Sequence, residues 1–179
     1  MIKRIFLIGM AGSGKTTVGK ELAKKLGWLF IDTDQRIEKV LNKKISDIFS
    51  EEGSEYFNKV ETDALEYAIK LGNETNIVIA TGGRTYLNDL NKALMIDSGL
   101  IIYLKSDTKT IYKRLNKPVE LKKRRFIWGI TKSTLKISIS SLLGVRKKYY
   151  SSCSIEINAS RSKKLIVNDI IKLFGVLNE

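Results

Sequence analysis

The 179-residue chain contains no histidine, one cysteine and one proline. Histidine is the commonest general base and transition-metal ligand, so proton transfer must rest on carboxylates, lysine, tyrosine or water. The single cysteine, Cys153, excludes an intrachain disulfide and a cysteine-based metal cluster. No apolar run approaches the ~20 residues that span a bilayer, and no cleavage region precedes the first apolar stretch. We therefore expect a cytoplasmic location and no membrane partner.

Acidic residues are also scarce, because 19 aspartates and glutamates oppose 32 lysines and arginines and leave a net charge of +13. Such a charge raises the possibility of a polyanionic partner. The basic residues are spread along the chain, however, and no nucleic-acid recognition pattern accompanies them. We expect no nucleic acid as primary partner. The length suits one domain over residues 1–179, and we expect a monomer.

Residues 9–17, GMAGSGKTT, fit the P-loop pattern G-x-x-x-x-G-K-[ST] without a gap. The apolar residues 5–8 predict a buried strand before it, and Val18, Leu22 and Leu26 recur as on one face of a helix after it. A chance glycine-rich turn is the alternative. The agreement of strand, loop, lysine, hydroxyl and helix favours a site for a nucleoside triphosphate.

The P-loop pattern carries its own chemistry. Its glycines let the backbone curl so that N–H groups form a concave nest for anions at the positive end of a helix. Lys15 can then reach the β- and γ-phosphates, and the Thr16 hydroxyl can bind Mg²⁺. The sequence thus predicts a nucleotide site with a magnesium ion.

Two carboxylates, Asp32 and Asp34, follow the second apolar run, residues 28–31. If strand geometry continues, residues at i and i+2 point the same way. One carboxylate can then hold a Mg²⁺-bound water while the other accepts a hydrogen bond from an acceptor hydroxyl. A polar turn with a helix N-cap is the alternative, and the neighbouring P-loop favours the functional interpretation.

Residues 35–71 are predicted to be helical, with a break at Gly53, and to form a lobe over the acceptor site. Residues 76–80 predict a third buried strand, followed by Gly82 and Gly83. Glycines at the carboxyl end of a strand let a small substrate approach the backbone closely. A plain tight turn is the competing interpretation.

The remaining chain continues the alternation of strands and helices. Strands are expected at 100–104 and 154–157, and helices at 108–115 and 135–150. This alternation predicts an α/β fold with a mainly parallel sheet covered on both faces. Residues 116–134 have no clean period and carry several cations, which fits either a solvated charge run or a closing lid that bears arginines.

The order and spacing of these motifs resemble the shikimate kinase family. The resemblance rests on the P-loop, Asp32-Thr33-Asp34, Phe57…Glu61, Ala80-Thr81-Gly82-Gly83 and Arg146…Tyr149. It implies a three-layer α/β/α fold of the P-loop kinase type, with a five-stranded parallel sheet, a substrate-binding lobe at about 35–71 and a lid at about 116–134. It also implies transfer of the ATP γ-phosphoryl group to the 3-hydroxyl of shikimate, on the way to chorismate.

The resemblance assigns roles residue by residue. The phosphates would be held by Gly12, Ser13, Gly14, Lys15, Thr16 and Thr17, with Thr16 and Asp32 at the metal. Arg114 would face the adenine, and Arg125 would be the lid arginine. The acceptor would be bound by Asp34, Asn58, Gly82, Gly83, Arg84 and Arg146. Of these, Lys15, Asp34 and Arg125 would be catalytic, with Arg146 on the acceptor carboxylate.

The chain departs from the family pattern at two positions of the acceptor site. The family has an arginine that binds the shikimate carboxylate after the phenylalanine of the third helix, whereas Phe57 is followed by Asn58. A third glycine would follow Gly83, and here it is Arg84. An asparagine at this position cannot form the charged, bidentate pair that an arginine forms with a carboxylate. We hypothesise that Arg84 replaces the missing charge; the alternative is that Arg84 points to solvent.

Two other functions stay open from the sequence. A related small-molecule kinase with a different polyhydroxyl acceptor would explain Asn58. A catalytically degenerate homologue that binds nucleotide as a regulator would explain both departures, although Lys15, Thr16, Asp32 and Asp34 favour retained catalysis.

Overall fold

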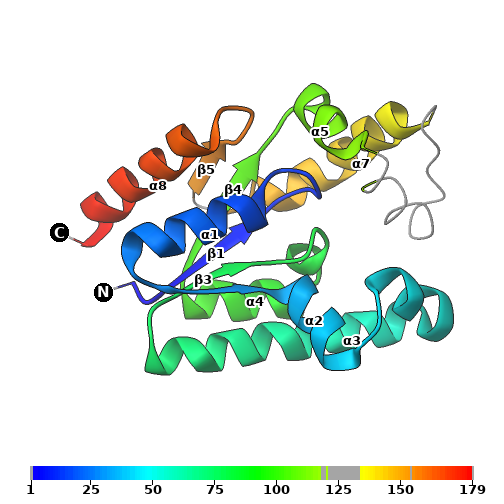
Figure 1. Cartoon of the computed structure of the whole chain (residues 1–179), viewed down its shortest axis with the longest axis horizontal. Coiled ribbons are helices and arrows are strands. Elements are labelled where there is room, and N and C mark those ends of the chain that lie inside the picture. The colour runs from blue at the N-terminus through cyan, green and yellow to red at the C-terminus, as the bar shows by residue number, and fades with distance from the viewer. Residues whose placement is uncertain (1, 118–119, 121–133, 154, 179) are drawn as a thin grey trace.

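Five parallel strands form the centre of the molecule (Figure 1). The computed structural model describes residues 2–117, 120, 134–153 and 155–178. The strands are β1 Arg4–Ile8, β2 Leu29–Asp32, β3 Ile77–Ala80, β4 Leu100–Lys105 and β5 Ile155–Asn158. Their order in the sheet is β2-β3-β1-β4-β5, and every neighbouring pair is parallel. The expected five-stranded parallel sheet is confirmed.

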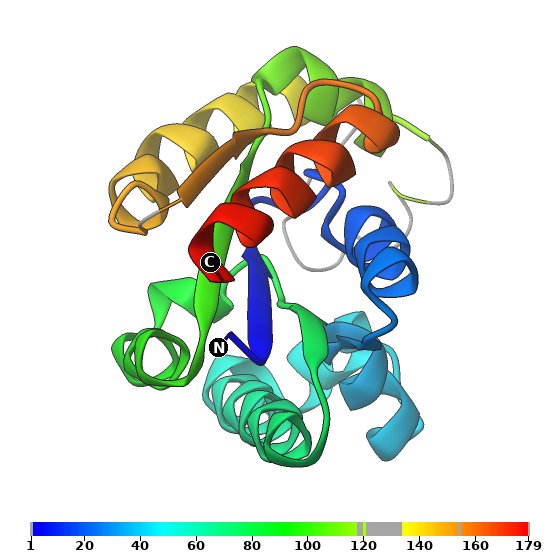
Figure 2. The same cartoon turned by 90° about the vertical axis from the view of Figure 1, so that its left-hand side faces the viewer.

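Helices cover both faces of this sheet, as the turned view shows (Figure 2). Helices α1 (Lys15–Leu26) and α8 (Lys163–Asn178) pack on one face, and α3 (Ile45–Glu74), α4 (Asp89–Ser98) and α7 (Leu135–Tyr150) pack on the other. The shorter elements are α2 (Thr33–Leu41), the 3₁₀ helix η1 (Thr85–Leu87) and α5 (Thr108–Leu115). The three-layer architecture expected from the sequence is therefore present.

The central strands are apolar throughout because both of their faces are buried. In β1, Ile5 and Leu7 join the core formed with α1 and α8, while Phe6 and Ile8 join the core formed with α3 and α4. None of these four side chains is exposed. Burial on this scale fixes the carboxyl ends of the strands, and the P-loop begins at that end of β1.

Helices α2 and α3, which we call the lobe, pack around a small core of their own that includes Ile37, Ile48 and Phe57. That this lobe binds the acceptor stays a prediction. Gly53 interrupts α3 with φ 78° and ψ −177°, a conformation outside the helical region that glycine adopts without steric cost. The break predicted at this residue is confirmed. Among the described residues, none of the helices combines the length and the apolar character that a membrane-spanning segment requires.

Candidate active site

The P-loop connects β1 to α1, as the pattern predicts. Gly14 caps the helix in the left-handed region, with φ 103°. Gly12 also has a positive φ, and a Cβ on it would lie 2.9 Å from Cγ of Leu115. Both positions therefore need glycine, and the loop backbone lies at the positive N-terminal end of α1.

Lys15 lies inside the loop, with only 8% of its surface exposed. Its Nζ donates hydrogen bonds to the carbonyl oxygens of Gly9, at 2.8 Å, and Met10, at 3.1 Å. Along the rest of the predicted phosphate-binding stretch, Ser13 is buried and Thr17 is exposed on α1. The ammonium group is thus fixed where the phosphate chain of a nucleotide would enter.

Thr16 and Asp32 meet beside the P-loop. The Thr16 hydroxyl donates a 2.6 Å hydrogen bond to Asp32 Oδ2, and Asp32 Oδ1 accepts one from the Gln35 N–H. Asp32 therefore caps α2 and also faces the nucleotide site. Hydroxyl and carboxylate oxygens are ligands that suit Mg²⁺, although the described residues hold no cluster of three His, Cys, Asp or Glu side chains that could bind a metal.

The two carboxylates of the Asp32-Thr33-Asp34 stretch do not share one direction, which corrects the strand geometry considered above. Helix α2 begins at Thr33, so the strand ends at Asp32. Asp32 meets Thr16, whereas Asp34 approaches Gly82. Because α2 begins directly after Asp32, the Asp32 carboxylate lies on the P-loop side and the Asp34 carboxylate lies beside Gly82.

Residues 81–84 follow β3 and are called the acceptor turn here, because the sequence predicts that the acceptor binds at them. The Gly82 N–H donates to Thr33 Oγ1 at 3.1 Å. A Cβ on Gly82 would lie 2.6 Å from Glu61 Oε1, 2.8 Å from Asp34 Oδ1 and 2.9 Å from Thr85 Oγ1. Three oxygen atoms from separate elements converge on this Cα, so the position has room only for glycine.

Gly83 brings the acceptor turn against the P-loop. A Cβ on it would lie 3.3 Å from the backbone nitrogen of Ala11. Its carbonyl accepts hydrogen bonds from the Tyr150 hydroxyl, at 2.7 Å, and from Arg146 Nη1, at 3.3 Å. Arg146 also lies 3.5 Å from Sδ of Met10, and it is 6% exposed. Helix α7 thus contacts both the P-loop, at Met10, and the acceptor turn, at Gly83.

Arg84 is exposed at the end of the acceptor turn. Its Cζ atom lies 5.7 Å from the ring centre of Phe49, and that ring packs 4.3 Å from the ring of Phe57. Asn58 follows Phe57 in α3 and is half-buried. The guanidinium of Arg84 therefore lies near Phe49 in α3, the helix that also contains Asn58.

Glu61 is the buried acid of the site, with 2% of its surface exposed. Burial raises the pKa of its carboxyl to about 7, and the charge of Asp34 adds to the rise. The Thr85 hydrogen bond and the charges of Arg84 and Arg146 act in the opposite direction. Its carboxyl therefore titrates near neutral pH.

Four contacts of the site were not assigned from the sequence: those of Thr33, Glu61, Thr85 and Tyr150. A signal existed for Glu61, because it occupies the apolar stripe of its helix, one turn after Phe57 and one turn before Leu65. A signal also existed for Tyr150, which is one helical turn from Arg146. Tyr149 is the residue quoted in the motif, but Tyr150 makes the buried contact.

Two arginines were expected near the nucleotide. Arg114 donates from Nη1 to the carbonyl oxygens of Gly12, at 3.1 Å, and Ser13, at 2.9 Å, and from Nη2 to that of Ala159. It therefore lies against the P-loop. Arg125 and most of the expected lid lie outside the described residues.

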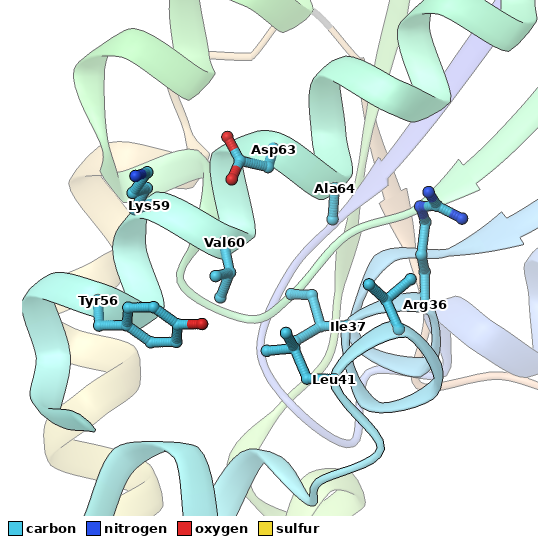
Figure 3. A pocket seen from close by; sticks show the side chains of 9 residues that line it. Arg36, Ile37, Leu41, Tyr56, Lys59, Val60, Asp63 and Ala64 are labelled. Carbon is cyan, nitrogen blue, oxygen red and sulfur yellow. The ribbon is translucent and has the colours of Figure 1, made fainter. Parts of the chain in front are cut away.

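A cavity of about 280 Å³ opens between α2 and α3 (Figure 3). Tyr56, Val60 and Ala64 line it from α3. By helical spacing, Asn58 and Glu61 lie on another face of the same helix. The cavity is therefore separate from the acceptor turn and does not extend the site.

A parallel sheet with a P-loop after its first strand, an aspartate beside the loop that caps the next helix, and a glycine turn next to the loop is typical of a P-loop kinase. A solved structure of low sequence identity has the same fold. Deoxyadenosine kinase from M. mycoides superimposes with a TM-score of 0.59 over 97% of this chain and 99% of that one, at 17% identity.

Proteins with higher sequence identity to this chain identify its family. A family model described as shikimate kinase matches residues 11–174. The shikimate kinase of Persephonella marina is 38% identical, over 95% of this chain and 98% of its own. That of Azobacteroides pseudotrichonymphae is 40% identical, over 96% of each chain. The structure of the Acinetobacter baumannii shikimate kinase in complex with shikimate has a TM-score of 0.88 at 26% identity, covering 100% of this chain and 96% of that one. This chain belongs to the shikimate kinase family.

Proposed function

We propose that this protein uses ATP to phosphorylate the 3-hydroxyl of shikimate. The observation that carries the proposal is the approach of the acceptor turn to the P-loop, where a Cβ on Gly83 would lie 3.3 Å from the Ala11 nitrogen. An acceptor bound at Gly82 and Gly83 therefore lies next to the phosphates held by the P-loop. Positioning and charge neutralisation of this kind account for most of phosphoryl-transfer catalysis.

On the nucleotide side, Lys15 neutralises negative charge that develops on the phosphates. The backbone of residues 12–17 binds the phosphate chain, and Arg114 lies where it can flank the base. Mg²⁺ is held with the help of Thr16 and Asp32, whose paired oxygens are separated by 2.6 Å. When bound, the ion supplies charge neutralisation at the transferred group.

On the acceptor side, Asp34 accepts a hydrogen bond from the acceptor hydroxyl and assists its deprotonation. Gly82 and Gly83 contact the ring through the backbone. Arg146 pairs with the carboxylate from its buried position on α7. Asn58 contributes hydrogen bonds only, and Arg84, whose guanidinium lies 5.7 Å from the ring centre of Phe49, supplies a second cation.

Two alternatives rest on those last two residues. Without a charged side chain at Asn58, the acceptor could be another polyhydroxyl compound that lacks a carboxylate. A catalytically degenerate protein would bind ATP and regulate a partner. The close approach of turn and loop and the buried Lys15 favour catalysis over regulation.

An assay for ADP release with purified protein and Mg-ATP separates these functions. The panel contains shikimate, gluconate and nucleoside monophosphates. We expect ADP only with shikimate. ADP release only with gluconate would mean that gluconate, and not shikimate, is the acceptor. If none of the acceptors gave ADP although ATP bound measurably, the protein would be a nucleotide-binding regulator and not a kinase.

We also infer that residues 1–179 act as one domain, that the protein is a cytoplasmic monomer, and that nucleic acid is not its primary partner. Residues about 35–71 would serve as the substrate lobe and about 116–134, including Arg125, as the lid. Size-exclusion chromatography with light scattering measures the molar mass in solution and so tests whether the protein is a monomer.

A further inference from the structure

Glu61 has no part in the functions assigned above, yet its carboxyl lies at the base of the acceptor turn. Its Oε1 is 2.8 Å from Thr85 Oγ1, and that hydroxyl oxygen is also 3.2 Å from the Gly82 carbonyl oxygen. A hydroxyl has one hydrogen to donate. Thr85 can therefore donate to Glu61 or to Gly82, but not to both at once.

The protonation state of Glu61 decides which of these two bonds forms. A protonated carboxyl can donate to Thr85 Oγ1, which leaves the Thr85 hydrogen for the Gly82 carbonyl. An ionised carboxyl has no proton and attracts the Thr85 hydrogen to itself, because a charged acceptor forms the stronger bond. The Gly82 carbonyl then loses this donor.

The charges around Glu61 make its ionisation matter for an anionic acceptor. Asp34 from α2 already supplies one carboxylate beside Gly82. Arg84 before η1 and Arg146 from α7 supply the facing cations, and the Tyr150 hydroxyl of α7 faces the same group. A second negative charge among these residues offsets the arginines that would attract a substrate carboxylate.

We propose that Glu61 is a positioning residue that holds the acceptor turn in its binding geometry while its carboxyl carries a proton. Loss of the proton removes the Thr85 bond from Gly82 and adds a negative charge beside Asp34, so that acceptor binding weakens. This inference rests on the proposed function in one respect, namely that the acceptor carries a carboxylate.

Binding of shikimate without nucleotide provides the test, because ATP itself titrates near neutral pH. Isothermal titration calorimetry at pH 6, 7 and 8 gives the Kd of the parent protein, and we expect it to rise by roughly fivefold across this range, as one added charge nearby predicts. The carboxylate of shikimate stays ionised throughout. In Glu61→Gln, the amide donates to Thr85 at every pH, so Kd should stay near the parent value at pH 6.

Matched variants separate the two parts of the mechanism. Glu55→Gln makes the same chemical change at an exposed position of α3 and should retain the parent pH profile. Thr85→Val removes the hydroxyl and should raise Kd at pH 6 at least twofold, whereas Thr85→Ser should restore the parent profile. If Glu61→Gln folds poorly, the contrast of valine and serine still tests the hydrogen-bond chain.

A rise of Kd with pH in Glu61→Gln equal to that of the parent would overturn the proposal. Equal profiles for Thr85→Val and Thr85→Ser would also contradict it. Absence of shikimate binding in every variant at every pH, together with no ADP release, would instead refute the proposed function. The two failures are therefore distinguishable.

Discussion

The nucleotide side of the site comes mainly from one continuous stretch of chain, whereas the acceptor side is assembled from four separate elements. Residues 9–17 supply the P-loop by themselves, and Asp32 and Arg114 contact it from elsewhere. The acceptor side needs the start of α2, the middle of α3, the turn after β3 and the end of α7. A local motif fixes the first side, and long-range packing fixes the second.

This difference predicts how each side fails. Changes in the P-loop remove a charge or a backbone conformation that the chemistry needs directly. Changes on the acceptor side alter the positions of several groups together, because Gly82 and Gly83 each contact residues from more than one element.

The largest loss is expected for Lys15→Ala. Removing the buried ammonium leaves the developing charge on the phosphates without its main partner, and kcat should fall by about a hundredfold to a thousandfold. Lys24→Ala, on the exposed face of the same helix, should keep kcat within about twofold. Steady-state kinetics with Mg-ATP and shikimate measure both. Equal activity of the two variants would show that Lys15 is not a catalytic residue.

Gly82→Ala should disrupt the acceptor side alone. The new Cβ would lie 2.6 Å from Glu61 Oε1 and 2.8 Å from Asp34 Oδ1, so the turn or both carboxyls must move. A displacement of about 1 Å near the reacting groups costs on the order of a hundredfold in kcat/KM. The KM for ATP should change by less than about twofold if the two sides are independent.

Gly175→Ala in α8 is the matched control, because a Cβ there has no neighbour within 4 Å. It should leave both kinetic constants unchanged. A large rise of the KM for ATP in Gly82→Ala would show that the acceptor turn and the P-loop act as one unit, so the two sides would not be independent.

Glu61 should make folding stability depend on pH. Its pKa is about 7 in the folded protein and 4.5 as the reference for the unfolded chain. The folded state therefore binds the extra proton between these values, and stability falls as pH rises through this window. From pH 5 to pH 8 the loss amounts to about 3 kcal/mol.

Urea unfolding at pH 5 and pH 8 measures this loss. Glu61→Gln cannot ionise, so its free energy of unfolding should fall by about 3 kcal/mol less than that of the parent over this range. Glu55→Gln should behave as the parent does. The same pH dependence in parent and Glu61→Gln would contradict a buried carboxyl that titrates near neutrality.

The sequence predicted the elements and the family well, for physical reasons that particular residues illustrate. Short apolar runs located all five strands, and the P-loop motif is contiguous, so residues 9–17 needed no tertiary information. The family and the enzyme class are confirmed by the family model and the relatives. The roles of Asp34, Arg146 and the other site residues remain predictions.

What the sequence could not predict depends on contacts between distant residues. Thr85 and Glu61 are 24 positions apart, and Tyr150 and Gly83 are 67 apart. Neither pair leaves a periodic pattern. The common direction of the carboxylates of Asp32 and Asp34 depended on strand geometry continuing past Asp32. It does not continue, because α2 begins at Thr33, two residues before the predicted start at residue 35, so the alternative of a helix N-cap at Asp32 is confirmed.

Arg84→Ala is expected to have the smallest effect, and it tests whether the acceptor side has compensated for Asn58. Arg84 is exposed, so its pairing with a carboxylate is screened by solvent. Its loss should raise the KM for shikimate by about fivefold, with the KM for ATP little changed. Arg161→Ala, which removes an exposed guanidinium paired with Asp169, is the control.

Two further measurements test whether the charge of Arg84 pairs with the shikimate carboxylate. The KM for the neutral amide of shikimate should be the same in the parent and in Arg84→Ala, because the amide offers no charge to pair with. Adding Asn58→Arg to Arg84→Ala should restore the KM for shikimate if one cation can replace the other. An unchanged KM in Arg84→Ala would mean that Arg84 points to solvent and that Arg146 binds the carboxylate without a second cation.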